Sequence, residues 1–82
     1  MGLKQNQQLL EQYPVLEFFQ YSHLPEELQP VSAPFNTIAW KLVKKFADTH
    51  ELRKALDRLL EAKDASVRAA FSPRLVASDE EE

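Results

Sequence analysis

Residues suited to holding an anionic, aromatic ligand occur in two parts of this sequence. Arg53 and Arg68 carry planar guanidinium groups whose paired donors match the oxygens of a phosphate. Tyr21 and His23 follow a pair of phenylalanines, and each combines an aromatic ring with a polar group that can face a ligand at a turn. These residue types indicate recognition of a small ligand.

The composition gives little support to reaction chemistry. The chain has no cysteine, which excludes disulfides, zinc fingers and iron–sulfur clusters. Its two histidines, His23 and His50, stand 27 positions apart, and a single glycine, Gly2, excludes glycine-rich phosphate loops. We therefore expect no enzyme activity, no metal site and no cofactor.

Lys63 departs from the apolar pattern around it, because a helical wheel places it among Leu56, Leu59, Leu60 and Val67. Three explanations are open. Its stem can cover apolar surface while the ammonium reaches water, it can fix the register of an oligomer, or it can hold a cation ready for an anionic ligand.

The neighbouring flank of the same predicted helix is charged. Arg53–Asp57 and Asp64–Arg68 have the i,i+4 spacing of ion pairs, which is typical of a solvated face. The two arginines of this face are also the side chains best suited to phosphate.

The positions of the prolines decide where long helices can form. Prolines stand at 14, 25, 30, 34 and 73, which leaves residues 35–72 free of them. An apolar repeat over residues 31–46 predicts a helix over residues 25–47. Because Pro30 and Pro34 each remove a helical hydrogen bond, we expect a kink or a restart there.

A second apolar repeat predicts a helix over residues 49–70, which Ser72 and Pro73 end. Asp48 and Glu51 have the spacing of a capping box, so Asp48 is the predicted N-cap of this helix.

The two ends of the chain differ in character from the middle. Residues 1–13 predict a short helix that ends near Pro14, and residues 15–24 predict a short helix that runs into a turn. The formal net charge is −3, and the last four residues are all acidic. The predicted organisation is a flexible or short helical N-terminus, a helical-hairpin domain and a disordered acidic tail, over residues 1–14, 15–72 and 73–82.

The predicted fold class is all-α, with two long antiparallel helices and a short N-terminal helical arm. A chain of 82 residues has a small core, and without disulfides or a metal the remaining means of stabilising it is assembly into an oligomer. Trp40 is predicted to face away from the apolar stripe, where it is an oligomer contact, a platform for a ligand base or merely exposed. Phe18 and Phe19 are expected to cap the hairpin core and to lie at the oligomer interface with Trp40.

Charge and hydropathy exclude several partners. Apart from its acidic end the chain is near neutral, without the basic face of a nucleic-acid polymer binder. No stretch of 18 apolar residues is present, and residues 1–8 lack the apolar region of a signal peptide. We expect a soluble, cytosolic protein that does not contact a membrane.

Three stretches resemble a known family. They are residues 18–25 (FFQYSHLP), residues 28–35 (LQPVSAPF), and residues 52–56 with 59–69 (LRKAL and LLEAKDASVRA). Together they look like the helical-hairpin domain of phage anti-CBASS sponges, which is shared with some anti-Thoeris sponges. The similarity covers residues 16–71.

The resemblance implies a non-enzymatic homohexamer that sequesters cyclic dinucleotides, and in some members cyclic trinucleotides, in the cytoplasm of the infected bacterial host. Tyr21 is similar to the family's base-stacking tyrosine, and His23 is placed to cap a phosphate or ribose. The family's lysine at the second helix matches Asn36 and Thr37, with Lys41 as a substitute one turn later. For a trinucleotide site the resemblance points to Arg53, Lys63 and Arg68.

A second hypothesis belongs to a different class. It describes a small oligomeric protein-interaction module, or a phage regulator, that docks a host protein through Trp40. A nucleic-acid binder is disfavoured, since a polymer requires a longer basic track.

Overall fold

The computed structural model describes residues 2–71, and every regular element in that range is helical. The elements are α1 (Gly2–Gln12), the 3₁₀-helix η1 (Pro14–Phe19), α2 (Gln29–Lys45) and α3 (His50–Ala70). The all-α prediction is confirmed for this part of the chain. The predicted disordered tail, residues 73–82, lies outside the described residues.

Proline sets the boundary between α1 and η1. Tyr13, which precedes Pro14, leaves the helical region with φ −124° and ψ 79°, as the residue before a proline tends to do. Its amide still donates to the Leu9 carbonyl at 2.8 Å and so closes the last turn of α1. Pro14 then begins η1, where its missing amide is no loss.

α2 begins later than predicted and is not interrupted. Residues 26–28 form a turn, and the helix begins at Gln29, with Pro30 in its first turn. Of the kink or restart expected at Pro30 and Pro34, the restart is wrong, because α2 is continuous through Pro34, and the kink stays a prediction. Pro34 lies early in the helix and removes one amide donor, a local cost that the burial of Ala39 and Val43 further along can offset.

α3 is capped by a different residue from the one predicted. The amide of Leu52 donates to the Thr49 hydroxyl at 3.1 Å, so Thr49 is the N-cap and Asp48 is not. Asp48 is instead engaged by Arg53, through two bonds of 2.8 and 2.7 Å. Because the Asp48 carboxylate is bonded to Arg53, the Thr49 hydroxyl accepts the hydrogen bond that caps α3.

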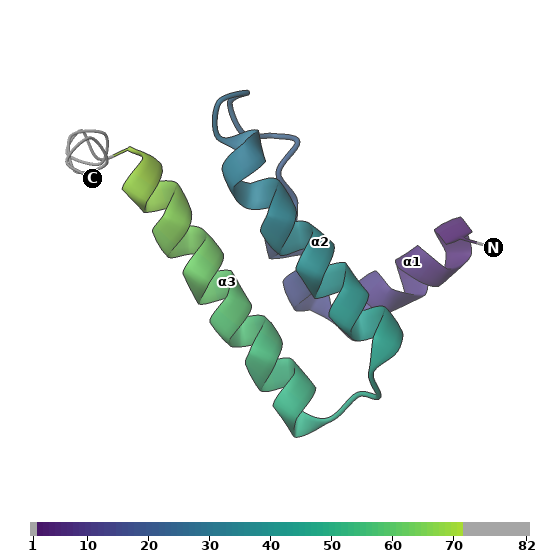
Figure 1. Cartoon of the computed structure of the whole chain (residues 1–82). Helices are drawn as coiled ribbons and strands as arrows, with labels where there is room; N and C mark the ends of the chain where they lie inside the picture. Colours follow the sequence, from purple (N-terminus) through teal and green to yellow (C-terminus); the bar gives the residue numbers. More distant parts are fainter. Residues whose placement is uncertain (1, 72–82) are drawn as a thin grey trace.

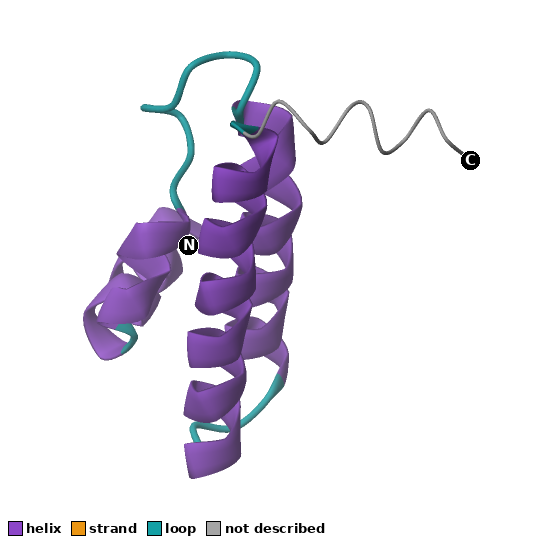
Figure 2. Cartoon of the chain, turned by 90° about the vertical axis from the view of Figure 1, so that its left-hand side faces the viewer, coloured by secondary structure: helices purple, strands orange, loops and turns teal. Residues whose placement is uncertain are grey.

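The described elements pack around one small core. α2 and α3 lie side by side and run in opposite directions, and η1 contacts both of them (Figure 1). The N-terminal segment lies on one side of the α2–α3 pair, with the loop before α2 at one end (Figure 2). Three of the core side chains come from residues 13–19 and four from the two long helices: Tyr13, Leu16, Phe19, Ala39, Val43, Leu52 and Leu56.

Ser32 is a polar residue inside this packing. It lies in the first half of α2, its exposed fraction is 0%, and its hydroxyl has no hydrogen-bond partner among the described residues. A small side chain at this position allows close packing, and its hydroxyl is desolvated without compensation.

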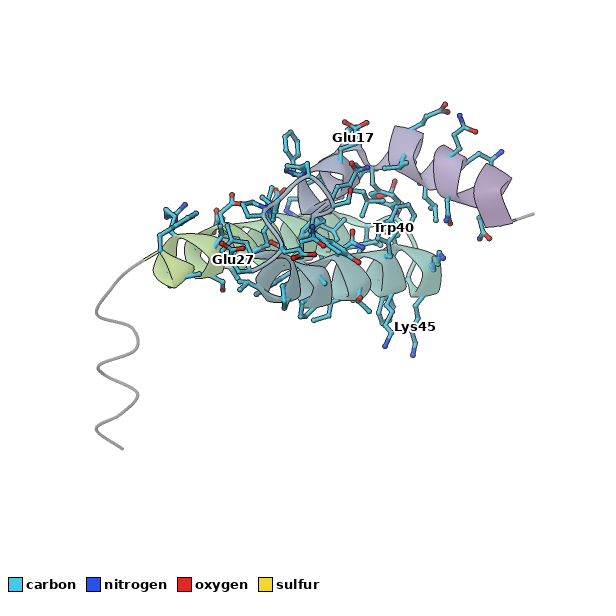
Figure 3. The ribbon with its side chains drawn as sticks, turned by 90° about the horizontal axis from the view of Figure 1, so that it is seen from above. Glu17, Glu27, Trp40 and Lys45 are labelled. Carbon is cyan, nitrogen blue, oxygen red and sulfur yellow. The ribbon has the colours of Figure 1, made fainter. Side chains whose placement is uncertain are left out.

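The aromatic side chains only partly follow the predictions. Phe19 is fully buried and caps the core as expected, but Phe18 is 63% exposed and does not. Phe19 therefore has no surface to offer a partner in this structure, whereas Phe18 has. Trp40 is half-buried and packs against the core, so the prediction that it faces away from the apolar side is wrong. Figure 3 shows Trp40 on the side of α2 that faces the N-terminal segment and Lys45 on the opposite side.

Several apolar side chains remain uncovered by the described chain. Phe46, Phe71 and Ile38 are 53%, 68% and 44% exposed, in addition to Phe18. None of the described helices is long and apolar enough to cross a membrane.

Candidate functional site

The loop between η1 and α2 carries the first two candidate residues. Tyr21 is half-buried and His23 is exposed. The loop is held by Gln29, whose side-chain amide donates to the Leu24 carbonyl at 2.9 Å and to the Ser22 carbonyl at 3.4 Å. The Leu24 amide also donates to the Tyr21 carbonyl at 3.0 Å and closes a turn around the two aromatic residues. Gln29 therefore positions this loop without taking part in the core.

The α2 candidates lie on a different surface. Thr37 and Lys41 are exposed and one turn apart, so their side chains share one face of the helix. Asn36 is half-buried beside them. Among these three, Lys41 is the only cation.

The three α3 candidates are not brought together within one chain. Arg53 and Arg68 lie fifteen residues apart on one helix, which separates them by about 22 Å along its axis. The Lys63 side chain is only 13% exposed, and its ammonium lies 3.0 Å from an Asp64 oxygen. This arrangement agrees with the first of the three explanations, a covered stem whose charge reaches the surface, and leaves the roles in an oligomer or toward an anionic ligand as predictions.

Both predicted i,i+4 ion pairs on α3 are wrong. Arg53 pairs with Asp48 at 2.7 Å, and Asp64 pairs with Lys63. Asp57 consequently has no ion pair or hydrogen bond within residues 2–71, although it lies one turn from Arg53.

Arg53 is the centre of a polar cluster that joins three elements. Its guanidinium carbon lies 4.6 Å from the centre of the Tyr13 ring, and its Nη2 donates to the Gln12 carbonyl at 3.3 Å. The Gln12 side chain in turn donates to Asp48 at 3.2 Å. The cluster fixes the end of α1 against the start of α3.

The hydrogen bonds of this cluster favour the ionised forms of Asp48 and Arg53. Hydrogen bonds from Arg53, and then from Gln12, hold the pKa of the Asp48 carboxyl below its usual value. The same bond with Asp48 raises the pKa of Arg53. Burial raises the pKa of the Tyr13 phenol, with a further contribution from the negative charge of Asp48. The Tyr13 phenol is therefore neutral at neutral pH.

A half-open pocket of about 230 Å³ adjoins the cluster, between η1 and α3. Its lining combines apolar and polar side chains. The lining residues are Tyr13, Pro14, Val15, Arg53, Leu56 and Asp57.

Sequence reasoning identified Arg53 but missed Tyr13 and the pocket. The usable signal was an aromatic residue directly before a proline, which places a large ring at a helix end. A second cation–aromatic contact, of Lys44 with the Trp40 ring at 5.6 Å, lies on α2. The described residues hold no group of three side chains able to bind a metal ion.

Comparisons of the chain with protein-family models, with curated proteins and with solved structures found no match. The resemblance to anti-CBASS sponges therefore stays a prediction from the three sequence stretches that carry it.

Proposed function

We propose that this protein is a non-enzymatic sponge that binds and sequesters cyclic di- or trinucleotide messengers and so blocks CBASS signalling in the cytoplasm of an infected bacterium. In this proposal α2 and α3 are the two long helices of a helical hairpin, and the working assembly is a homohexamer. Its ligands are held between protomers.

The observation that carries the proposal is the loop with Tyr21 and His23. A half-buried phenol beside an exposed imidazole, on a loop held by Gln29, supports stacking on a base next to a hydrogen bond to ribose or phosphate. Tyr21 is not part of the core cluster, so its ring is not needed to build that cluster.

The exposed apolar side chains support assembly. Phe18, Ile38 and Phe46 lie at the surface, whereas only eight apolar side chains are buried within residues 2–71. Burying such side chains against other protomers removes apolar surface from water and builds the walls that a two-helix unit lacks.

The test is calorimetry of the purified full chain against a panel of cyclic di- and trinucleotides, with the oligomeric state measured on the same sample. We expect tight binding, a hexamer and unaltered ligand after denaturation of the complex. Tyr21→Ala should weaken binding about 5- to 150-fold, whereas Tyr21→Phe should retain most of it because the ring face carries the contact. Binding unchanged by Tyr21→Ala, or a monomer without affinity for any member of the panel, would refute the proposal.

The exposed phenylalanines also favour a second candidate, a module that docks a host protein. Phe46 stands beside Lys44 and Lys45 at the end of α2, an apolar group flanked by cations. Unlike the first hypothesis, this candidate predicts no affinity for cyclic nucleotides and loss of partner binding on Phe46→Ala.

A further inference from the structure

The pocket between η1 and α3 is lined by apolar side chains and by three polar ones. Its apolar lining comes from Pro14, Val15 and Leu56, of which Leu56 is only 1% exposed. Its two charged groups come from α3, where Arg53 and Asp57 stand one turn apart with their β-carbons about 5–6 Å from each other, and Tyr13 adds a phenol. A pocket that combines apolar surface with a few polar groups is typical of a site for a small organic ligand.

Arg53 lines this pocket and has one amino group without a protein partner in the described part of the chain. Its Nε and Nη2 are occupied by Asp48 and the Gln12 carbonyl, whereas its Nη1 donates to no protein group within residues 2–71. Asp48 also neutralises its charge, so the guanidinium offers donors without a net attraction for a phosphate.

Asp57 presents only acceptors. Its carboxylate has no partner in the described part of the chain, and an ionised carboxylate accepts hydrogen bonds through both oxygens. A ligand that hydrogen-bonds to both side chains has two adjacent donors for the Asp57 carboxylate and an acceptor for the Arg53 guanidinium.

Among nucleobases, guanine meets these requirements. Its N1–H and N2 amino groups are adjacent donors, and its O6 and N7 are the acceptors that arginine recognises. Adenine places the N1 acceptor where guanine has a donor, so it would set a lone pair against the Asp57 carboxylate. Uracil and cytosine each lack the second adjacent donor.

The size of the pocket agrees with one base. Its volume of about 230 Å³ is below the range for drug-sized ligands, so it admits a single ring system rather than a dinucleotide. Because the pocket is half-open, the ribose and phosphate of a nucleotide remain outside it. The Tyr21 loop lies on the other side of η1 in the sequence and does not line this pocket.

We infer that the Tyr13–Asp57 pocket is a guanine-binding site, in which Asp57 accepts from the Watson–Crick edge and Arg53 donates to O6 or N7. The choice of a nucleobase rests on the proposed function, and it restricts the bound messengers to those that contain guanine. Pro14, Val15 and Leu56 supply the apolar surface against the ring.

The test is titration of the ¹⁵N-labelled full chain with guanosine, inosine and adenosine, followed through the amides of Val15, Leu56 and Asp57. Guanosine should shift these amides and bind about 5- to 150-fold more tightly than adenosine, the discrimination expected of one good bidentate pair. Inosine, which lacks the N2 amino group, should lie between them. Equal affinities for guanosine and adenosine, or shifts confined to other residues, would overturn the inference.

Two variants separate recognition from folding. Asp57→Asn replaces one acceptor by a donor and should abolish the preference for guanosine, while retaining the amide spectrum of a folded chain. Glu61→Gln, one turn further along α3 and outside the pocket, makes the same change of charge and should leave the preference intact. A preference that persists in Asp57→Asn, or that is lost equally in Glu61→Gln, would contradict the assignment.

Failure of this inference is distinguishable from failure of the proposed function. Cyclic dinucleotides that bind through Tyr21 with no difference between the guanine and adenine forms would leave the sponge standing and remove the guanine site. If guanosine binds at Asp57 and no cyclic oligonucleotide is sequestered, the guanine site is supported and the sponge function is refuted.

Discussion

Ser32→Ala should make this protein more stable, which is unusual for a change at a fully buried position. The Ser32 side chain is 0% exposed and its hydroxyl has no hydrogen-bond partner within the described chain. A buried donor or acceptor left unsatisfied costs about 1–3 kcal/mol, and alanine removes that cost while keeping the β-carbon in place.

The magnitude needs a correction for helix propensity. Alanine is a better helix former than serine by about half a kcal/mol, and that gain applies to any helical serine. Ser66, half-buried in α3, supplies the matched control. We therefore expect Ser66→Ala to raise the free energy of unfolding by about 0.5 kcal/mol and Ser32→Ala to raise it by about 1.5–3.5 kcal/mol.

The assay is urea unfolding followed by circular dichroism at one fixed protein concentration, because assembly makes stability depend on concentration. A domain of this size gains about 4–8 °C in melting temperature per kcal/mol, so thermal scans give a second measurement. Should Ser32→Ala be no more stable than Ser66→Ala, the hydroxyl has a partner in the folded protein, such as a water or a ligand. The inference of an unsatisfied buried group would then be refuted.

Three further outcomes are expected from the same structure. Leu56→Ala should lower the free energy of unfolding by about 2–5 kcal/mol in urea unfolding, because Leu56 is 1% exposed in a core of few residues. Thr49→Ala should lower it by about 1 kcal/mol through loss of the α3 N-cap, whereas Thr49→Asp should retain the cap. The lowered pKa of Asp48 stabilises the folded chain above the ordinary carboxyl pKa, and this contribution is lost as pH falls through the folded value. Asp48→Asn should therefore make unfolding less sensitive to acid below about pH 4, as followed by circular dichroism during acid titration.

The positions of the helices were the most predictable feature of this chain. The side-chain contacts between elements were the least predictable. Proline positions and the apolar repeat located α3 to within one residue at its start, because both act within one turn of the chain. The choice between Asp48 and Thr49 as N-cap depended on Arg53, which competes for the carboxylate and lies five positions away. Which group the Asp48 carboxylate pairs with depends on side-chain geometry, which residue spacing alone does not predict.

The error over Trp40 has a definite origin. The sequence favoured a stripe that begins at Val31, and Trp40 lies opposite to that residue on the wheel. The buried face of α2 is centred instead on Ser32, Ala39 and Val43, which places Trp40 only about 80° from its centre. Small residues mark the close contacts of this helix, and a hydrophobicity pattern gives small residues little weight.

The candidate site could be predicted only in part from the sequence, for a similar reason. Tyr21, His23 and Arg53 could be selected by residue type, but the pocket depends on η1 packing against α3 across about 40 intervening residues. No local pattern specifies that Tyr13 lies under Arg53, since that contact arises only when the chain is folded.

The contribution of η1 to the core has a consequence for synthesis on the ribosome. Leu16 and Phe19 are fully buried in the folded chain, and part of their cover is supplied by Leu52 and Leu56. At a translation rate of roughly 5–20 residues per second, the start of α3 is synthesised about 2–7 seconds after these two residues. During that interval a nascent chain exposes apolar groups that the finished protein conceals, and slow codons between η1 and α3 would prolong it.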